Sequence, residues 1–387
     1  MLSTLAVAGY RSLRALEMPL GRLNVITGSN GAGKSNLYRA LRLLAETAQG
    51  GVVSALAREG GLSSTLWAGP EEISKAMRRG DVEVEGGPRR DPIALKLGFA
   101  DDDFGYAIDL GLPQRLSSMF SGDPQIKREV IWSGPFLRNK SNLLVDRSSS
   151  VVSVRDGRSW RVVHQHLSQY ESMFTQIADP VGAPEVLALR ERIRGWRFYD
   201  HFRTDVDAPA RASQIGTRTP VLSHDGRDLA AAWRTIQEMS DGRALEAAVE
   251  DAFPGARVDI VAPDGRFELR LSQHGLLRPL SVAELSDGTL RYLLWIAALH
   301  TPRPPPMMIL NEPETSLHPD LLLPLARLII KASERTQVWV VSHASRLISA
   351  LTEAEDCNAV HLEKSLGETR IRGHGLLDGP PWHWPER

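Results

Sequence analysis

The chain has 387 residues, of which 42% are hydrophobic and 24% are charged, a composition that is typical of a folded protein and excludes predominant disorder. Its 46 basic and 47 acidic residues give a formal net charge of -1, so no global field draws the chain to nucleic acid or membrane. The sequence has one cysteine, lacks a run of about 18 apolar residues, and begins without the apolar block of a signal peptide. We therefore expect a cytoplasmic protein of about two to three domains, with no membrane contact.

The N-terminal residues predict a strand, a glycine-rich loop and a helix in succession. Apolar patterning indicates strands at 2–8 and 23–27 and a helix over 34–48. The sequence GSNGAGKS, which starts at Gly28, fits the phosphate-binding pattern GxxxxGK[ST] in the strand–loop–helix context that the pattern requires. In such a loop, backbone N–H groups and the helix N-terminus face the phosphates of a nucleotide.

This phosphate loop supplies most of the predicted nucleotide-binding residues. Lys34 is expected to reach the β and γ phosphates, and Ser35 is expected to ligate a metal ion. The loop therefore predicts a bound nucleoside triphosphate with Mg²⁺. The residues expected to contact the nucleotide in this loop are Gly28, Ser29, Asn30, Gly31, Ala32, Gly33, Lys34, Ser35 and Asn36.

Residues 51–240 show a mixed pattern without internal repeats. Short alternating segments at 94–99 and 151–154 indicate strands, and a helix is predicted over 184–194. The aromatic segment WRFYDHF at 196–202 is interpreted as core packing, with a separate, unidentified role as the alternative.

The second half of the sequence alternates helices and strands, which favours a parallel sheet flanked by helices. Two alternating segments around Asp264-Gly265, at 257–262 and 267–271, predict a hairpin. The predicted helices are 244–253, 288–300, 319–334 and 345–352, and the predicted strands are 307–310 and 337–342.

A phosphate loop needs a strand end that carries acidic residues, to hold the metal and to position water. The segment MMILNEPE at 307–314 is the best match, which makes the predicted nucleotide domain discontinuous. Asn311 stands at the position of the expected metal-binding acid; its amide oxygen can accept from a metal-bound water but brings no charge, which lowers the expected Mg²⁺ affinity. Glu312 is predicted to polarise the attacking water. The alternative is a buried strand followed by an acidic helix start.

Two further segments carry candidate site residues. Ser286 and Gly288, in LSDGT, precede an apolar helix, so a hydroxyl, a glycine and a helix N-terminus could together recognise a γ-phosphate. An ordinary N-cap is the alternative. His343 follows a buried strand, where the active edge of a parallel sheet lies; a capping or core histidine is the alternative.

The order of these motifs resembles the ABC-type ATPase heads of the SMC, RecF and OLD group. The resemblance covers residues 1–44 and 280–350. It implies an α/β P-loop NTPase fold, with a mixed sheet flanked by helices and a central α+β insertion lobe. The implied domains are an ATPase domain formed by 1–50 and 241–387, and an insertion lobe over 51–240.

The resemblance also assigns roles to individual residues. It implies that Ser286 and Gly288 belong to the signature motif, that Glu312 is the catalytic base, that 315–319 is the D-loop, and that His343 is the switch histidine. Arg11, of the pair Tyr10-Arg11, is expected to touch a phosphate. Lys34, Glu312 and His343 are thus the expected catalytic residues, and Ser35 and Asn311 the expected metal-binding residues.

The implied function is ATP–Mg²⁺ hydrolysis by a homodimer that holds ATP between two heads. The implied setting is DNA repair and recombination or anti-phage defence, and a co-encoded effector or nuclease is a candidate partner. Asn311 keeps an alternative open, a non-hydrolysing switch that regulates a protein partner. DNA is a further candidate partner, for which two basic stretches, 138–161 and 190–218, are the local support. A solvated face is the alternative interpretation of both stretches.

Overall fold

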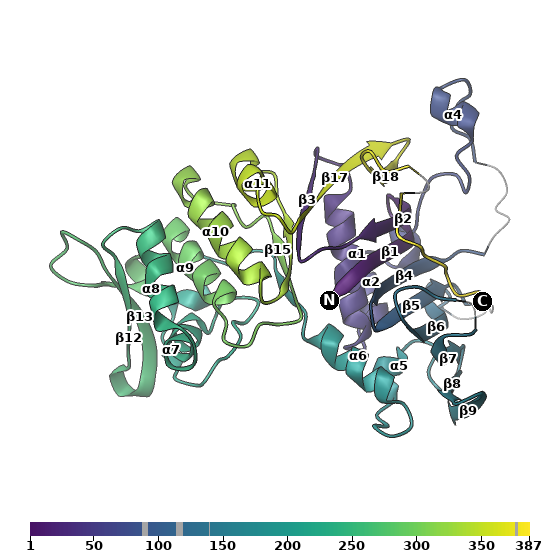
Figure 1. Ribbon diagram of the computed structural model, residues 1–387, viewed down its shortest axis with the longest axis horizontal. Coiled ribbons are helices and arrows are strands. Elements are labelled where there is room, and N and C mark those ends of the chain that lie inside the picture. Colours follow the sequence, from purple (N-terminus) through teal and green to yellow (C-terminus); the bar gives the residue numbers. More distant parts are fainter. Residues whose placement is uncertain (87–91, 114–118, 139, 376–377) are drawn as a thin grey trace. The chain divides into compact units, whose positions relative to one another are not determined.

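The computed structural model describes residues 1–86, 92–113, 119–138, 140–375 and 378–387 (Figure 1). These residues form two compact units. Unit 1 consists of 1–21, 28–195 and 360–387, and unit 2 consists of 22–27 and 196–359. The units therefore divide the chain at other points than the domain boundaries predicted at residues 50 and 240.

Unit 1 is built on an eight-stranded antiparallel sheet in the order β2-β1-β4-β5-β6-β7-β8-β9. β1 pairs with β2 on one side and with β4 on the other, so strands from the predicted insertion complete the N-terminal sheet instead of forming a separate lobe. The strands are β1 (Leu2–Tyr10), β2 (Leu13–Pro19), β4 (Leu95–Asp101), β5 (Phe104–Gly111), β6 (Gln125–Ser133), β7 (Leu143–Ser148), β8 (Val151–Asp156) and β9 (Ser159–His164).

Helix α1 (Lys34–Thr47) packs against β1 and β4 of this sheet. Its apolar residues Leu37, Leu41 and Leu44 recur at helical spacing and are buried, and the chain turns away at Gly50, which has a φ of 80°. The predicted helix over 34–48 is thus confirmed. The other helices of unit 1 are α2 (Val52–Arg58), α3 (Leu62–Thr65), α4 (Lys75–Arg79), α5 (Met173–Gln176) and α6 (Pro184–Arg194).

Unit 2 contains a parallel sheet in which β10, β15, β16 and β3 are neighbours in that order. β17 follows β3 in the strand order; it begins in unit 2 and ends in unit 1, where it pairs with β18. The strands are β3 (Leu23–Gly28), β10 (Arg197–Tyr199), β15 (Met307–Asn311), β16 (Gln337–Val341), β17 (Cys357–Ser365) and β18 (Glu368–Ile371).

The helices of unit 2 surround a core that is rich in aromatic side chains. α8, α9 and α10 pack on one another (Figure 1), and α9 is buried on nearly all sides. The rings of Tyr199, Phe202 and Trp295 lie with their centroids 4.8 to 6.2 Å apart, as the core-packing interpretation of segment 196–202 predicts. The helices are α7 (Leu229–Met239), α8 (Gly242–Ala252), α9 (Asp287–Leu299), α10 (Leu322–Ser333) and α11 (Ser345–Thr352).

A small antiparallel sheet completes unit 2. Asp264 and Gly265 both have positive φ, 50° and 77°, which suits the tight connection between two twisted strands and confirms the predicted hairpin. The strands of this sheet are β11 (Gln214–Ile215), β12 (Arg257–Val261), β13 (Arg266–Ser272) and β14 (Leu280–Ser281). Nowhere in the described parts of the chain is a helix long and apolar enough to span a membrane.

Candidate functional site

The phosphate loop in unit 1 has a backbone that glycine alone accommodates at two points. Gly28 has a φ of 146°, and a Cβ there would lie 2.4 Å from the Leu362 carbonyl oxygen. Gly33 has a φ of 109°, and a Cβ there would lie 2.0 Å from Oγ1 of Thr369. Gly28 and Gly33 are therefore required by the close approach of β17 and β18 as well as by the turn itself.

The side chain of Lys34 lies across the loop that precedes it. Its Nζ donates to the carbonyl oxygens of Gly28, at 2.6 Å, and Ser29, at 3.0 Å, and the residue is 5% exposed. Ser35, the next residue, is exposed. The start of α1 thus brings a helix N-terminus, a lysine ammonium and a hydroxyl together, an arrangement suited to a polyphosphate and its metal.

A series of side-chain hydrogen bonds links this loop to neighbouring segments of unit 1. Asn36 Nδ2 donates to Ser12 Oγ at 2.8 Å, Ser12 and Thr369 share a hydrogen bond of 2.7 Å, and Thr369 Oγ1 donates to the Ala32 carbonyl at 2.8 Å. Asn36, predicted as a nucleotide contact, therefore has its amide engaged with Ser12. Ser12 and Thr369 were not predicted, because nothing in the sequence indicates that residue 369 folds back onto the loop.

Arg11 is held in an ion pair within unit 1. Its Nη2 lies 2.7 Å from Oε2 of Glu59, which also accepts from the Tyr10 hydroxyl at 2.6 Å. Burial, helped by this carboxylate, raises the pKa of Tyr10. Arg11 has a φ of 47°, a conformation secured by the hydrogen bond from its N–H to the Thr65 carbonyl, 2.7 Å long. The predicted phosphate contact of Arg11 requires the exchange of this carboxylate partner.

The parallel strands of unit 2 end at one edge of their sheet. Asn311, at the end of β15, is level with Val341 of β16, which is level with Ile26 of β3. Gly28 of the phosphate loop follows Ile26 by two residues in the chain. The register therefore aligns the end of the strand that leads into the loop with the ends of the strands that precede Glu312 and His343.

Glu312 and His343 are neighbours at this edge. His343 Nε2 lies 3.4 Å from Glu312 Oε1, and both side chains are partly exposed, 40% and 48%. Glu312 has a φ of 49° and donates its N–H to the Val341 carbonyl at 2.8 Å, so its backbone is fixed while its carboxylate is accessible. This pair could orient a water molecule.

Glu314 holds the segment that carries His343. Its Oε1 accepts from Ser342 Oγ at 2.7 Å and from the N–H groups of His343 and Ala344 at 2.8 and 3.1 Å. Its Oε2 is buried and has no hydrogen-bond partner among the described residues. Glu314 was missed as a site residue, although its place in NEPE, two residues after Glu312, could have suggested it.

The signature segment begins helix α9. Ser286 is the N-cap residue: its Oγ accepts from the Thr289 N–H at 3.2 Å and shares a hydrogen bond of 2.8 Å with the Thr289 hydroxyl. The N-cap interpretation is therefore correct for the described structure, and this geometry leaves the side chain exposed at a helix N-terminus.

One face of α9 contacts the loop that follows Glu312. Arg291 Nη1 donates to the Thr315 carbonyl at 2.7 Å, and Trp295 Nε1 donates to the Pro313 carbonyl at 3.1 Å. A Cβ on Gly288 would lie 3.2 Å from the Ser316 carbonyl. Three residues on one side of the helix thus contact three residues of the loop. The signature segment and the loop after Glu312 are therefore packed directly against each other within unit 2.

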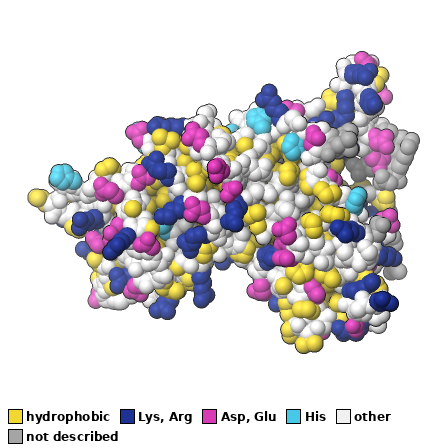
Figure 2. Space-filling view, viewed as in Figure 1, with side chains coloured by type: hydrophobic (Ala, Val, Ile, Leu, Met, Phe, Trp, Pro, Cys, Tyr) yellow, Lys and Arg dark blue, Asp and Glu magenta, His cyan; other side chains and the backbone are white. Residues whose placement is uncertain are grey.

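The basic stretches proposed for DNA do not form continuous exposed tracks. Arg147 is fully buried and pairs with Glu129, 2.9 Å from Nη1 to Oε2, and the side chain of Arg211 is 10% exposed. On the face drawn in Figure 2, basic and acidic side chains are interspersed. Arg147 cannot contact a phosphate backbone, so including it in the first stretch was wrong.

A capping box precedes the signature segment and gives a testable titration. Glu284 accepts from Arg278, at 2.6 and 3.0 Å, and from the N–H and hydroxyl of Ser281, which together lower its pKa from 4.5 to about 2. Because the pKa is lowered on folding, the stabilisation by this carboxylate is present above about pH 4.5 and is lost as the pH falls toward 2.

We expect Arg278→Ala to raise the pKa of Glu284 from about 2 toward 4.5, because the hydrogen bond from the arginine is the largest cause of the shift. Carboxyl chemical shifts followed by NMR across pH 2 to 6 would measure this, with Arg270→Ala, which leaves the box intact, as the control. A pKa that stays near 2 in Arg278→Ala would contradict the assignment.

Residues 23–349 match a family described as "AAA domain, putative AbiEii toxin, Type IV TA system", a range that includes the phosphate loop, LSDGT, NEPE and His343. The chain belongs to this AAA family. A search of the curated proteins gave no match. The predicted membership of an ABC-type ATPase head family is confirmed, and the family is one of ATP-binding ATPases.

A solved structure of an SMC head has the same fold. An SMC head bound to the C-terminal winged-helix domain of ScpA aligns with a TM-score of 0.50 and 14% identity, covering 97% of this chain and 98% of that chain. The SMC head domain from Thermotoga maritima aligns with a TM-score of 0.49 and 14% identity, over 97% and 99%. The first alignment confirms the predicted fold class of this AAA protein, an α/β ABC-type head.

Proposed function

We propose that this AAA protein binds ATP with Mg²⁺ through its phosphate loop and hydrolyses it. The observation that carries the proposal is the geometry at the start of α1, where the buried Lys34 ammonium donates to two loop carbonyls and Ser35 is exposed beside it. An incoming triphosphate would replace those carbonyls as the partner of Lys34, because phosphate oxygens carry negative charge and the carbonyls are neutral.

Mg²⁺ fits the donors of this loop. The described residues contain no cluster of three or more acidic, histidine or cysteine side chains that could hold a metal by themselves. Mg²⁺ commonly binds through one or two protein oxygens, substrate phosphates and waters, so the Ser35 hydroxyl suffices as a direct ligand. Asn311 would hold a metal-bound water through its amide oxygen. The bound ion would neutralise charge that develops on the γ-phosphate.

Hydrolysis is assigned to the residues at the end of β15 and β16. Glu312 would accept the proton of the attacking water, and His343, 3.4 Å from Glu312, would donate to the γ-phosphate. Glu314 would keep the His343 backbone in place through its hydrogen bonds to the N–H groups of His343 and Ala344.

We further propose that two copies complete each site. Ser286, which is exposed, and Gly288, which is partly exposed, lie at the N-terminus of α9, which would bind the γ-phosphate held by the loop of a second copy. A two-fold arrangement would then give two equivalent sites. ATP that binds the closed pair more tightly than a single copy would drive association by mass action.

The description of the family favours anti-phage defence over DNA repair as the setting. It names a toxin of a toxin–antitoxin system. We therefore propose that ATP controls a defence activity, with a co-encoded protein as the partner, and we propose no DNA contact from the basic stretches.

Asn311 favours a second candidate function, an ATP-dependent switch with negligible turnover that acts on a protein partner. The amide at the end of β15 adds no charge to the metal's water shell, so Mg²⁺ would be held more weakly than by a carboxylate. Binding and dimerisation would remain, while the hydrolysis step would be slow.

Phosphate release from ATP, measured across a Mg²⁺ titration, separates the two functions. We expect Mg²⁺-dependent release by the unaltered chain, and Asn311→Asp to lower the Mg²⁺ midpoint by roughly fivefold and to raise turnover, because one charge is restored near the ion. Release by Asn311→Asp alone would support the switch. Absence of release from both proteins while ATP is bound would contradict hydrolysis by Glu312.

A further inference from the structure

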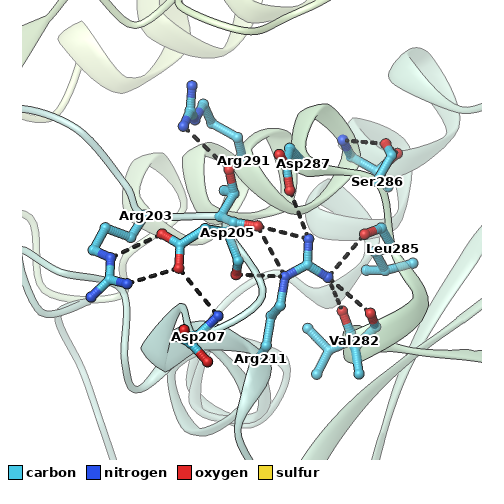
Figure 3. A network of polar contacts seen from close by, with 12 residues as sticks. Arg203, Asp205, Asp207, Arg211, Val282, Leu285, Ser286, Asp287 and Arg291 are labelled. Carbon is cyan, nitrogen blue, oxygen red and sulfur yellow. Dashed lines mark hydrogen bonds and ion pairs between the residues drawn. The ribbon is translucent and has the colours of Figure 1, made fainter.

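Arg211 donates several hydrogen bonds around the signature segment (Figure 3). It ends a short 3-10 turn, Pro209–Arg211, that lies between β10 and β11 in the chain, and its side chain is 10% exposed. Its guanidinium donates on two sides: to the segment that precedes Ser286 and to the segment that follows Phe202. No motif in the sequence marks this residue.

The first side of the contact fixes both neighbours of Ser286. Nη1 donates to the carbonyl oxygens of Val282, Ala283 and Leu285 at 3.0, 3.1 and 2.9 Å. Nη2 donates to Asp287 Oδ1 at 2.9 Å. One guanidinium therefore holds the residue before Ser286 by its carbonyl and the residue after it by its carboxylate, which fixes the direction in which the Ser286 side chain and the α9 N-terminus face.

The second side anchors the guanidinium to the core. Nε and Nη2 donate to the Thr204 carbonyl at 3.0 and 2.8 Å, and Nε donates to the Asp205 carbonyl at 3.1 Å. Phe202, two residues before Thr204, is buried against Trp295, and its carbonyl accepts from Arg291 at 2.9 Å. The segment that accepts these hydrogen bonds from Arg211 is thus itself bonded to α9 and packed against its core.

We propose that Arg211 is a positioning residue that holds Ser286 in the orientation needed to bind the γ-phosphate of a second copy. This proposal rests on the ATP-dependent dimer proposed above. Only a planar group with several fixed donors can serve both segments at once, which is why arginine and not lysine suits the position. Arg211 does not belong to the phosphate loop, so its loss would weaken dimerisation and leave ATP binding by one copy intact.

The test uses the full chain in a Glu312→Gln background, where bound ATP would persist. Sedimentation with ATP and Mg²⁺ would give the dimer dissociation constant, and fluorescence of a labelled ATP analogue would give the affinity of one copy. We expect Arg211→Ala to raise the dimer dissociation constant at least about tenfold with the analogue affinity unchanged. Arg203→Ala is the matched control, because Arg203 is 57% exposed and pairs with Asp205 in the same segment.

The outcomes distinguish the two proposals. A parent Glu312→Gln protein that binds ATP but stays monomeric overturns the dimer and Arg211's role with it. A parent that dimerises, together with an Arg211→Ala protein that dimerises equally well, overturns the role of Arg211 alone. If thermal unfolding shows that Arg211→Ala is not folded, Arg211→Lys takes its place. The lysine keeps the positive charge but cannot reach both segments. An Arg211→Lys protein that dimerises as well as the parent would therefore also overturn the role of Arg211.

Discussion

Replacing Glu312 by glutamine should lower ATP turnover by about 10² to 10⁴-fold, the range that a general base commonly contributes. The change keeps the size and hydrogen-bonding reach of the side chain but removes the group that accepts the proton from water. Glu312 is 48% exposed at the end of β15, and its backbone is fixed by the hydrogen bond to Val341, so glutamine should fit without disturbing the fold.

Phosphate release at saturating ATP and Mg²⁺ would measure this effect. Glu355→Gln is a suitable control, since Glu355 is exposed in the loop that follows α11 and should leave turnover unchanged. Nucleotide binding by Glu312→Gln should be retained, because the carboxylate does not hold the phosphates. Turnover within about twofold of the unaltered chain would remove Glu312 from the mechanism and leave the hydrolytic base unidentified.

Replacing Lys34 by alanine should weaken ATP–Mg²⁺ binding by about 100-fold or more. The ammonium would supply two or more charge-assisted contacts to the phosphates, and each is worth about 1.5 to 3 kcal/mol. In the nucleotide-free loop the same group donates to the Gly28 and Ser29 carbonyls, so its removal also loosens the loop that receives the phosphates.

Isothermal titration of ATP in the presence of Mg²⁺ would test this prediction. Lys331→Ala provides a lysine control, because Lys331 is exposed in the last turn of α10. A circular dichroism melt would establish that Lys34→Ala is folded. Affinity equal to that of the unaltered chain would show that the phosphate loop is not the nucleotide site.

Much of the fold could be predicted because its signals are local. The helix over 34–48 has a glycine turn at each end and apolar residues at helical spacing, and Asp264-Gly265 has the turn chemistry of a hairpin. The alternation of helices and strands after residue 286 likewise predicted the elements α9 to α11. In each case the residues that specify the element lie within the element or beside it.

The organisation of unit 1 could not be predicted in this way. β1 pairs with β4, whose residues lie about ninety positions further along the chain, and this pairing is decided by complementary faces and not by a local pattern. The sequence therefore suggested an insertion lobe where the structure has a single eight-stranded sheet. β2 was missed for a different reason: it pairs with its chain neighbour β1, but its alternating segment is short and lies next to a turn-like segment.

The candidate site likewise contains residues that a local motif predicts and residues that only long-range contacts place there. The loop glycines, Lys34 and Glu312 follow from motifs, whereas Thr369, Glu314 and Arg211 act through contacts with residues distant in the sequence. The expected phosphate contact of Arg11 came from resemblance alone, and the structure gives this side chain a carboxylate partner in Glu59. Residues that position a site need only a donor or acceptor in the right place, so their sequence signal is weak.

The composite, two-copy site is tested most directly by the mass of nucleotide-loaded Glu312→Gln. Light scattering with ATP and Mg²⁺ at micromolar concentration should give twice the 42.7 kDa of one chain, and adding Ser286→Arg should return the mass to that of one chain with ATP still bound. A Glu312→Gln protein that carries ATP and yet keeps the mass of a single chain would contradict the composite site.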